Sequence, residues 1–381
     1  MNKYKRILDL PKLLEQKSFF LLGPRATGKT FLINQQLSNQ ATIINLLKTD
    51  QYLRFSTEPH TLEDFVRTST KNIIVIDEIQ RIPQLLNEVH HLIESSNYHF
   101  LLTGSSARKL KAQDVNLLAG RAWEARLFPL TSHEIPEFNL QRYLHFGGLP
   151  DIYAHINPLE QLYAYTDTYL KEEIQAESLT RTIPAFTRFL QTAAITSGHI
   201  LNYTNLSSDL GIPASTLREY YRILEDTLIG FTLPAWTKSV KRKPSSTGKF
   251  FLFDIGVRNI LAGDESISDK SELFGNLFEH FIILETRAYL SYRRKRKPIS
   301  FWRSKHGHEV DLLIGDDIAI EIKSANRITQ KHAKGLKSLK EEGIFKRYLI
   351  VSQDTIPTKK EGIESMQWQT FLEDLWADKI V

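Results

Sequence analysis

The chain has 381 residues, 41% of them hydrophobic and 24% charged, which is an ordinary composition for a folded globular protein and too long for a single core. It contains no cysteine, which excludes disulfides, thiolate metal sites and cysteine nucleophiles; its net charge of +5 is compatible with a nucleic-acid partner but does not establish one. No apolar run is long enough to cross a bilayer and no apolar signal segment follows the N-terminal charges, so we expect a cytoplasmic protein with no membrane partner.

Three segments follow one another along the chain. Residues 1–155 alternate short apolar runs with helical stretches, which predicts an α/β domain with a parallel sheet and strands at 19–22, 43–44, 73–76 and 100–102. Residues 156–262 are mainly helical and close with two strands, which predicts a helical lid and a winged module with strands at 228–236 and 250–253. Residues 263–381 form a second α/β unit, with a helix expected at 272–289 and strands at 300–302, 310–314 and 318–323.

A phosphate-binding loop follows the first predicted strand. Residues 23–30 fit the pattern G-x-x-x-x-G-K-[ST] and lead into a helical stretch. The glycines let backbone amides curl around phosphate groups, Lys29 supplies a point charge, and Thr30 offers a hydroxyl to magnesium. We therefore expect ATP and Mg²⁺ to bind at Gly23, Pro24, Arg25, Ala26, Thr27, Gly28, Lys29 and Thr30.

Two adjacent carboxylates end the strand predicted at 73–76. We expect Asp77 to hold magnesium and Glu78 to orient and deprotonate the attacking water. The next strand ends at Thr103, whose hydroxyl is the expected sensor of the γ-phosphate or the water. The strand at 43–44 separates the P-loop strand from the Asp-Glu strand, as in AAA+ and RecA-like ATPases rather than kinases.

Phosphoryl transfer also needs an arginine that neutralises developing charge, and a neighbouring subunit often supplies it. Arg121 is the candidate, Arg108 is its competitor, and a plain surface arginine is the alternative to both. An Arg121 that acts in trans requires a homo-oligomer, such as a hexameric ring.

The order of the short motifs gives the chain a resemblance to a known family. It resembles the prokaryotic AAA-type ATPases that join a Gly-Pro-Arg P-loop domain to a C-terminal domain of unknown function. The resemblance extends over the whole chain and rests, beyond the P-loop and Asp77-Glu78, on residues 103–106, 118–121, 128–130, 147–150 and 249–254. Ala26-Thr27 departs from the longer polar or branched pair expected after Arg25. The resemblance implies a winged-helix middle segment and a C-terminal fold similar to restriction-type nucleases.

The middle segment contains the pattern of a helix-turn-helix. A helical stretch ends at Gly211 and a second one begins after Pro213. Arg218 and Arg222 lie one helical turn apart and are expected to face a DNA groove. A basic wing between the two following strands is expected to add Lys238, Lys241, Arg242, Lys243 and Lys249. The alternative is an ATPase lid or a protein-docking surface with solvated charges.

The C-terminal unit contains the pattern D-x9-E-x-K. Asp311 precedes a turn, and Glu321 and Lys323 project from one face of the returning strand. Carboxylates can hold Mg²⁺, and the lysine can position a nucleophile, so the pattern resembles that of PD-(D/E)xK nucleases, with Glu279 completing the metal site. An active nuclease, a nucleic-acid-binding relic and a surface hairpin all remain open.

A basic run stands beside this unit. Arg293, Arg294 and Arg296, with Lys295 and Lys297 between and after them, are expected to grip a phosphate backbone, and a solvated loop is the alternative. The sequence as a whole predicts an ATP-driven DNA-processing protein that performs branch migration, unwinding or cleavage. A slow nucleotide-dependent switch or scaffold that recruits a protein partner is the alternative function.

Overall fold

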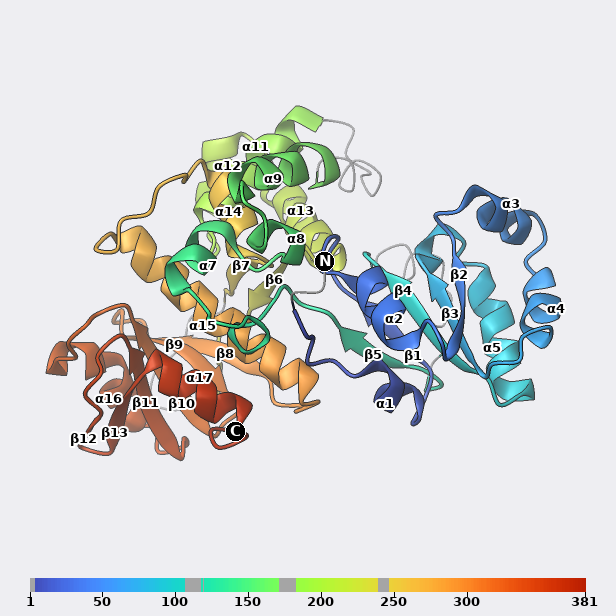
Figure 1. Cartoon of the computed structure of the whole chain (residues 1–381). Helices are drawn as coiled ribbons and strands as arrows, with labels where there is room; N and C mark the ends of the chain where they lie inside the picture. The colour runs from blue at the N-terminus through green and yellow to red at the C-terminus, as the bar shows by residue number, and fades with distance from the viewer. Residues whose placement is uncertain (1–3, 107–117, 119, 171–182, 239–246) are drawn as a thin grey trace.

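The computed structural model describes residues 4–106, 118, 120–170, 183–238 and 247–381 (Figure 1). Its N-terminal part is a five-stranded sheet in which every neighbouring pair is parallel. The order is β2-β3-β4-β1-β5, with β1 at Phe19–Leu22, β2 at Ala41–Asn45, β3 at Ile73–Asp77, β4 at His99–Gly104 and β5 at Trp123–Arg126. Parallel strands end at the same edge, so the polar residues after β1, β3 and β4 are brought together.

Helices cover both faces of this sheet because successive residues of a buried strand point to opposite sides. Phe20 and Leu22 of β1 join the apolar cluster made with α3 (Thr49–Thr57), α4 (Thr61–Arg67) and α5 (Leu85–Ser95). Phe19 and Leu21 join the opposite cluster, made with α1 (Leu10–Leu14) and α2 (Lys29–Leu37).

Strand β2 intervenes between β1 and β3 in sequence, as expected, but it does not separate them in space. It lies at the edge of the sheet, and β4 lies between β1 and β3. The edge strand β5 pairs with β1 and was not predicted, since its four residues, Trp-Glu-Ala-Arg, carry no apolar run.

The middle part is helical. It consists of α7 (Leu140–Phe146), α8 (Pro150–Tyr153), α9 (Pro158–Ala164), the π-helical turn η3 (Tyr165–Leu170), α11 (Ile183–Ile195), α12 (Tyr203–Leu210), α13 (Ala214–Asp226) and α14 (Ile255–Ala262). Gly211, with φ 64°, ends α12 in the left-handed region that a residue with a side chain avoids. Strands β6 (Gly230–Leu233) and β7 (Lys249–Leu252) pair antiparallel after α13. The helix-turn-helix and the hairpin therefore form where the sequence predicts them, whereas α7 and α8 lie in the stretch that the sequence assigns to the N-terminal domain.

The C-terminal part is a six-stranded mixed sheet in the order β12-β13-β11-β10-β9-β8. The strands are β8 (Ile299–Arg303), β9 (Glu309–Ile314), β10 (Ile318–Lys323), β11 (Arg347–Ser352), β12 (Thr358–Lys360) and β13 (Ile363–Gln367). Helices α15 (Glu272–Tyr292) and α17 (Trp368–Trp376) share an apolar cluster with one face, and α16 (Lys334–Lys340) with the other. The three strands predicted here form within one residue of their expected bounds, and the helix predicted at 272–289 extends to Tyr292.

Helix α15 joins the three parts. It contacts β5 of the first sheet, α7 and α14 of the middle part, and β10 and α17 of the C-terminal part, and Figure 1 shows it lying between them. None of the helices in the described ranges is long and apolar enough to span a membrane.

Two short motifs that lie far apart in sequence meet at Asp254. Its carboxylate caps α14 by accepting the Val257 N–H at 3.1 Å and also accepts the Gly148 N–H at 2.8 Å. A Cβ on Gly147 would lie 2.0 Å from Asp254 Oδ1, so this position, with φ 70°, has no room for a side chain. Burial raises the pKa of Asp254 to about 6. This contact fixes α8, which begins at Pro150 beside the P-loop.

Candidate nucleotide site

The P-loop has the backbone that phosphate binding needs. Ala26 and Gly28 have positive φ angles, 65° and 90°, which turn the loop sharply before α2 begins at Lys29. A Cβ on Gly23 would lie 2.5 Å from the Leu127 carbonyl oxygen, so the start of the loop is pressed against the chain after β5. The amides of the loop and the N-terminus of α2 then offer donors and positive dipole charge to an anion.

Lys29 is buried and turned back on its own loop. Its Nζ donates to the carbonyl oxygens of Gly23 at 2.7 Å and Pro24 at 3.1 Å. The two carbonyl oxygens accept hydrogen bonds from the Lys29 ammonium. A phosphate in the loop would give this ammonium a charged acceptor in their place.

The two halves of the predicted site meet through hydroxyl groups. Thr30 Oγ1 donates to Asp77 Oδ2 at 2.9 Å. Thr103 Oγ1 donates to the other oxygen of Asp77 and accepts the Glu78 N–H at 2.9 Å. Thr103 is fully buried with both roles of its hydroxyl used, so it positions Asp77 and Glu78 and does not face the cavity as the expected sensor. Ser105, two residues further on, lines the cavity instead.

Glu78 is held in an unusual conformation. Its φ of 64° is left-handed, which is rare for a residue with a side chain and typical of functional sites. Gln80 Nε2 donates to Glu78 Oε2 and, at 3.2 Å, to Ser105 Oγ. Gln80 therefore fixes the orientation of the predicted general base, a role that sequence reasoning missed because Gln80 follows the carboxylate pair with no motif of its own.

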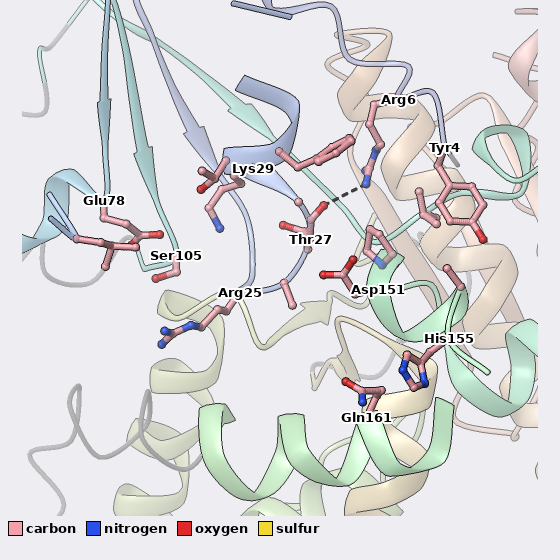
Figure 2. A pocket seen from close by; sticks show the side chains of 18 of the residues that line it. Tyr4, Arg6, Arg25, Thr27, Lys29, Glu78, Ser105, Asp151, His155 and Gln161 are labelled. Carbon is pink, nitrogen blue, oxygen red and sulfur yellow. Dashed lines mark hydrogen bonds between the residues drawn. The ribbon is translucent and has the colours of Figure 1, made fainter. Parts of the chain in front are cut away.

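A cavity of about 930 Å³ opens over the P-loop, and the sequence-predicted residues from Arg25 to Thr30 line it together with Glu78. Figure 2 shows Arg25, Glu78 and Ser105 on one side of the P-loop. Tyr4, Asp151, His155 and Gln161 lie on the other side, from the N-terminal segment, α8, the turn after it and α9. The volume suits a nucleotide rather than a lone phosphate group.

Arg6 ties the P-loop to the rest of the molecule. It is buried, and its guanidinium donates to the Thr27 carbonyl oxygen at 3.1 Å, the Phe128 carbonyl oxygen at 2.6 Å and the Tyr292 hydroxyl at 2.9 Å. It also forms an ion pair with buried Glu134 at 3.0 Å. Tyr292 ends α15, so one side chain connects the nucleotide loop with the C-terminal part.

Magnesium fits this site. Thr30 lines the cavity and offers a hydroxyl oxygen, and buried Asp77, which accepts the hydrogen bond of that hydroxyl, has carboxylate oxygens behind it; both are the hard ligands that Mg²⁺ prefers. When bound with a nucleotide, the ion supplies positive charge to the phosphate oxygens. Glu78 is placed to take a proton from a water molecule, and Lys29 and the loop amides to hold the phosphates.

The predicted arginine fingers lie away from the cavity or outside the described residues. Arg121 forms an ion pair with Glu94 of α5 and does not line the cavity, and Arg108 belongs to the undescribed stretch 107–117. Three other arginines line the cavity, Arg6, Arg25 and Arg81, and Arg81 donates to the Leu46 carbonyl oxygen at 2.7 Å.

The predicted DNA-binding residues are only partly on free surface. Arg218 is exposed and lies 4.7 Å over the ring of Tyr203, and Arg222 is exposed too and approaches Glu219 at 3.7 Å and Asp226 at 3.8 Å. Lys238 pairs with Asp316 at 2.6 Å. Lys241, Arg242 and Lys243 lie outside the described residues.

Lys249 is not part of the wing, which corrects the expectation from sequence. It is buried at the start of β7, and its ammonium pairs with Glu279 and Glu309. Both faces of β7 are covered, so Lys249 is buried whichever way it points, while the expectation took its charge as a sign of exposure.

The basic run at 293–297 is largely engaged within the molecule. Arg293 donates to the Trp376 carbonyl oxygen at 2.7 Å, and Arg294 lies 4.8 Å over the ring of Trp123. Lys295 pairs with Asp378 at 3.0 Å and Lys297 with Asp317 at 2.9 Å, while Arg296 is exposed. The run therefore ties the end of α15 to β5 and to the C-terminal segment.

The C-terminal pattern converges as predicted, but with lysines among the carboxylates. Lys323 Nζ lies 2.8 Å from Glu321 Oε1 and 3.2 Å from Asp311 Oδ2, which also accepts the Ile322 N–H. Burial raises the pKa of Glu279 and of Glu321. The described part of the chain holds no group of three or more histidine or carboxylate side chains arranged for a metal, so the residues predicted as ligands, Glu279, Asp311 and Glu321, do not fit one in this arrangement.

The parallel sheet, the P-loop and the carboxylates at the end of β3 together give the N-terminal part the features of a P-loop nucleotide-binding domain, the class to which AAA domains belong. A family model described as an AAA domain matches residues 15–136. Two further models, described as domains of unknown function (DUF8612 and DUF4143), match residues 137–268 and 274–371.

Curated relatives extend over most of the chain at low identity. A protein of Haemophilus influenzae, described as uncharacterized, is 23% identical and aligns over 79% of this chain and 78% of its own length. An uncharacterized protein of Methanocaldococcus jannaschii is 22% identical over 97% of this chain and 90% of its own length. Among solved structures, the Aeropyrum pernix ORC1 protein in complex with DNA aligns over 67% of this chain and 91% of its own, at 12% identity and a TM-score of 0.26, which is too low to establish a shared arrangement.

Proposed function

We propose that the chain binds ATP with Mg²⁺, hydrolyses it, and uses the cycle to control its engagement with DNA. The observation that carries the ATPase half is the network of Thr30, Asp77, Thr103 and Glu78, which assembles a magnesium ligand and a general base beside the P-loop. The match of residues 15–136 to an AAA domain supports the same conclusion.

The cavity suggests how the nucleotide lies. The P-loop and Glu78 mark the phosphate end. Tyr4 and His155 lie on the other side of the P-loop, and Leu130 and Ala154 are also among the lining residues, a mixture of apolar surface and a few polar groups that suits a nucleobase. In this arrangement α8 and α9 act as the lid of the site, and Asp254 holds α8 in place through Gly148.

The DNA half rests on the middle part. Helices α12 and α13, joined at Gly211, and the β6-β7 hairpin follow one another as in a winged helix, and Arg218 on α13 is exposed. We propose that α13 contacts DNA. Branch migration and unwinding are the outputs that such coupling supports, whereas the lysine-filled carboxylate cluster gives no support to cleavage.

The test is steady-state ATP hydrolysis with and without single-stranded, duplex and branched DNA, at two salt concentrations. Glu78→Gln is expected to lower kcat by roughly 10²- to 10⁴-fold while nucleotide binding persists. Stimulation by one DNA form, weakened by salt and by Arg218→Ala, supports the proposal. Arg67→Ala is the matched control, because Arg67 is an exposed arginine on α4 paired only with Glu63 among the described residues.

One observation favours a second function, a slow nucleotide-dependent switch or scaffold that recruits a protein partner. Arg6 links the Thr27 carbonyl oxygen of the P-loop to Tyr292 of α15, so a change in the loop has a direct route to the C-terminal part. Slow turnover that is indifferent to every DNA form, with tight nucleotide retention, would decide for the switch. Either function requires a homo-oligomer, such as a hexameric ring, if Arg121 acts on the site of a neighbouring subunit. An ATPase that is fully active as a monomer would refute the proposed oligomer.

A further inference from the structure

Charged side chains of both signs are buried together where the middle part meets the C-terminal sheet. The carboxylates come from α15, β9 and β10, and we call them the carboxylate cluster: Glu279, Glu309, Asp311 and Glu321. Two ammonium groups lie among them. Lys323 belongs to the same sheet, whereas Lys249 comes from β7 of the middle part.

Lys249 makes the shortest contact in this group. Its Nζ lies 2.6 Å from Glu309 Oε1 and 2.9 Å from Glu279 Oε1. Its side chain is only 4% exposed, and its ammonium lies 5.3 Å over the ring of Phe301. A buried ammonium is tolerated only when opposite charges surround it, and here two carboxylates contact it directly.

The backbone of Lys249 cannot move independently of the middle part. It pairs with Leu233 in the β6-β7 hairpin and forms a bridge with Ile200 on its other side. Its ammonium therefore reaches the carboxylate cluster only while the hairpin is docked on α15 and β9. One charge thus adds to a contact that apolar packing and the backbone bridge between Ala235 and Phe301 also hold.

The cluster also differs from a metal site in what its oxygens bind. Lys323 takes one oxygen each of Glu321 and Asp311, and Lys249 takes one each of Glu279 and Glu309. A divalent cation needs several of these oxygens to turn toward one point, and it would meet two ammonium groups there.

We propose that Lys249 is the built-in cation of the carboxylate cluster: its ammonium stands where a metal ion would be expected, and it latches the middle part to the C-terminal sheet. The C-terminal part then requires no metal ion to fold. Removal of this one positive charge turns the cluster into a site that attracts a divalent cation.

The first experiment measures Mn²⁺ binding by electron paramagnetic resonance. The protein is nucleotide-free and carries Asp77→Asn, so that the P-loop site does not hold the ion. The expected result is no saturable Mn²⁺ site. One equivalent of bound Mn²⁺ that is lost on adding Asp311→Asn would overturn the proposal. This measurement needs no substitution at Lys249 and therefore stands even if Lys249 variants do not fold.

The second experiment removes the ammonium. Lys249→Met removes the ammonium that contacts Glu279 and leaves half-buried Glu309 with Arg303, at 3.4 Å, as its ion-pair partner, so Tm is expected to fall by roughly 6 °C or more. Adding Glu279→Gln is expected to recover part of the loss, and Mn²⁺ is expected to raise the Tm of Lys249→Met but not of the parent. Lys238→Met is the matched control, because Lys238 pairs with Asp316 on the surface. A Tm for Lys249→Met equal to that of this control would refute the latch.

Discussion

Thr30 Oγ1 donates a hydrogen bond to Asp77 Oδ2 at 2.9 Å, across 47 positions of sequence. The two residues follow β1 and β3, which are not neighbours in the sheet, because β4 lies between them. They meet because all three strands end at the same edge. The residues predicted to bind magnesium and those predicted to bind phosphate are therefore in direct contact.

Gln80→Ala is expected to lower kcat by roughly 10- to 100-fold with little change in KM, because the orientation of a general base contributes to the barrier rather than to binding. The amide nitrogen of Gln80 donates to Glu78 and to Ser105, its two partners among the described residues. Steady-state kinetics check this. Wild-type kcat in Gln80→Ala would mean that the contact with Glu78 has no catalytic role.

Thr103→Val is expected to destabilise the fold by about 1–3 kcal/mol and to slow turnover, because it leaves the Glu78 N–H without an acceptor. Thr103→Ser keeps the hydroxyl and is the control, expected to retain most activity. Urea unfolding and ATPase assays measure the two effects. If valine and serine behave alike, the hydroxyl does not position the carboxylates.

Arg6→Met is expected to destabilise the fold by about 3–5 kcal/mol, because it leaves Glu134 as an unpaired buried charge. Arg67→Met breaks an exposed ion pair with Glu63 and is expected to destabilise the fold far less, because solvent screens that pair. Denaturant unfolding of both variants gives the comparison. Equal losses in the free energy of unfolding would show that the contacts of Arg6 between the P-loop and α15 contribute no more to stability than a surface ion pair.

Stability is expected to fall as pH rises from 4.5 to 7, in part through Glu285, a buried residue that accepts the Ser132 N–H and the Trp376 Nε1–H. Burial raises the pKa of Glu285 to about 7 from its ordinary 4.5. Between these two pH values the folded chain therefore keeps a proton that the unfolded chain has released. The stability that Glu285 contributes is complete below pH 4.5 and is lost above pH 7. The free energy of unfolding falls by up to about 1.4 kcal/mol per pH unit in between.

Glu285→Gln isolates this contribution, because Glu279, whose pKa burial also raises, stays in both proteins. The variant is expected to show a shallower dependence of the free energy of unfolding on pH across the same window. Parallel profiles for the two proteins would assign the pH dependence to other groups.

Local sequence was sufficient to predict an element or a motif wherever its residues are neighbours in the chain. The eight residues of the P-loop carry their own glycines, lysine and threonine, and the apolar run before Asp77-Glu78 can only be a buried strand, so both were predicted in place. The helix-turn-helix elements and the C-terminal strands were predicted for the same reason, since period and turn residues are local signals.

The tertiary structure decided the roles of side chains whose contacts come from distant parts of the sequence. Whether Thr103 faces the cavity or fixes Asp77 depends on a hydroxyl's neighbours across the sheet, and a sequence pattern carries no information on these. Lys249 was predicted to lie in a basic wing and is instead buried between Glu279 and Glu309, because a lysine's charge indicates exposure only until folding brings carboxylates to it. The sequence by itself determined the chemistry available to this protein; the fold decided which charges face a ligand and which face each other.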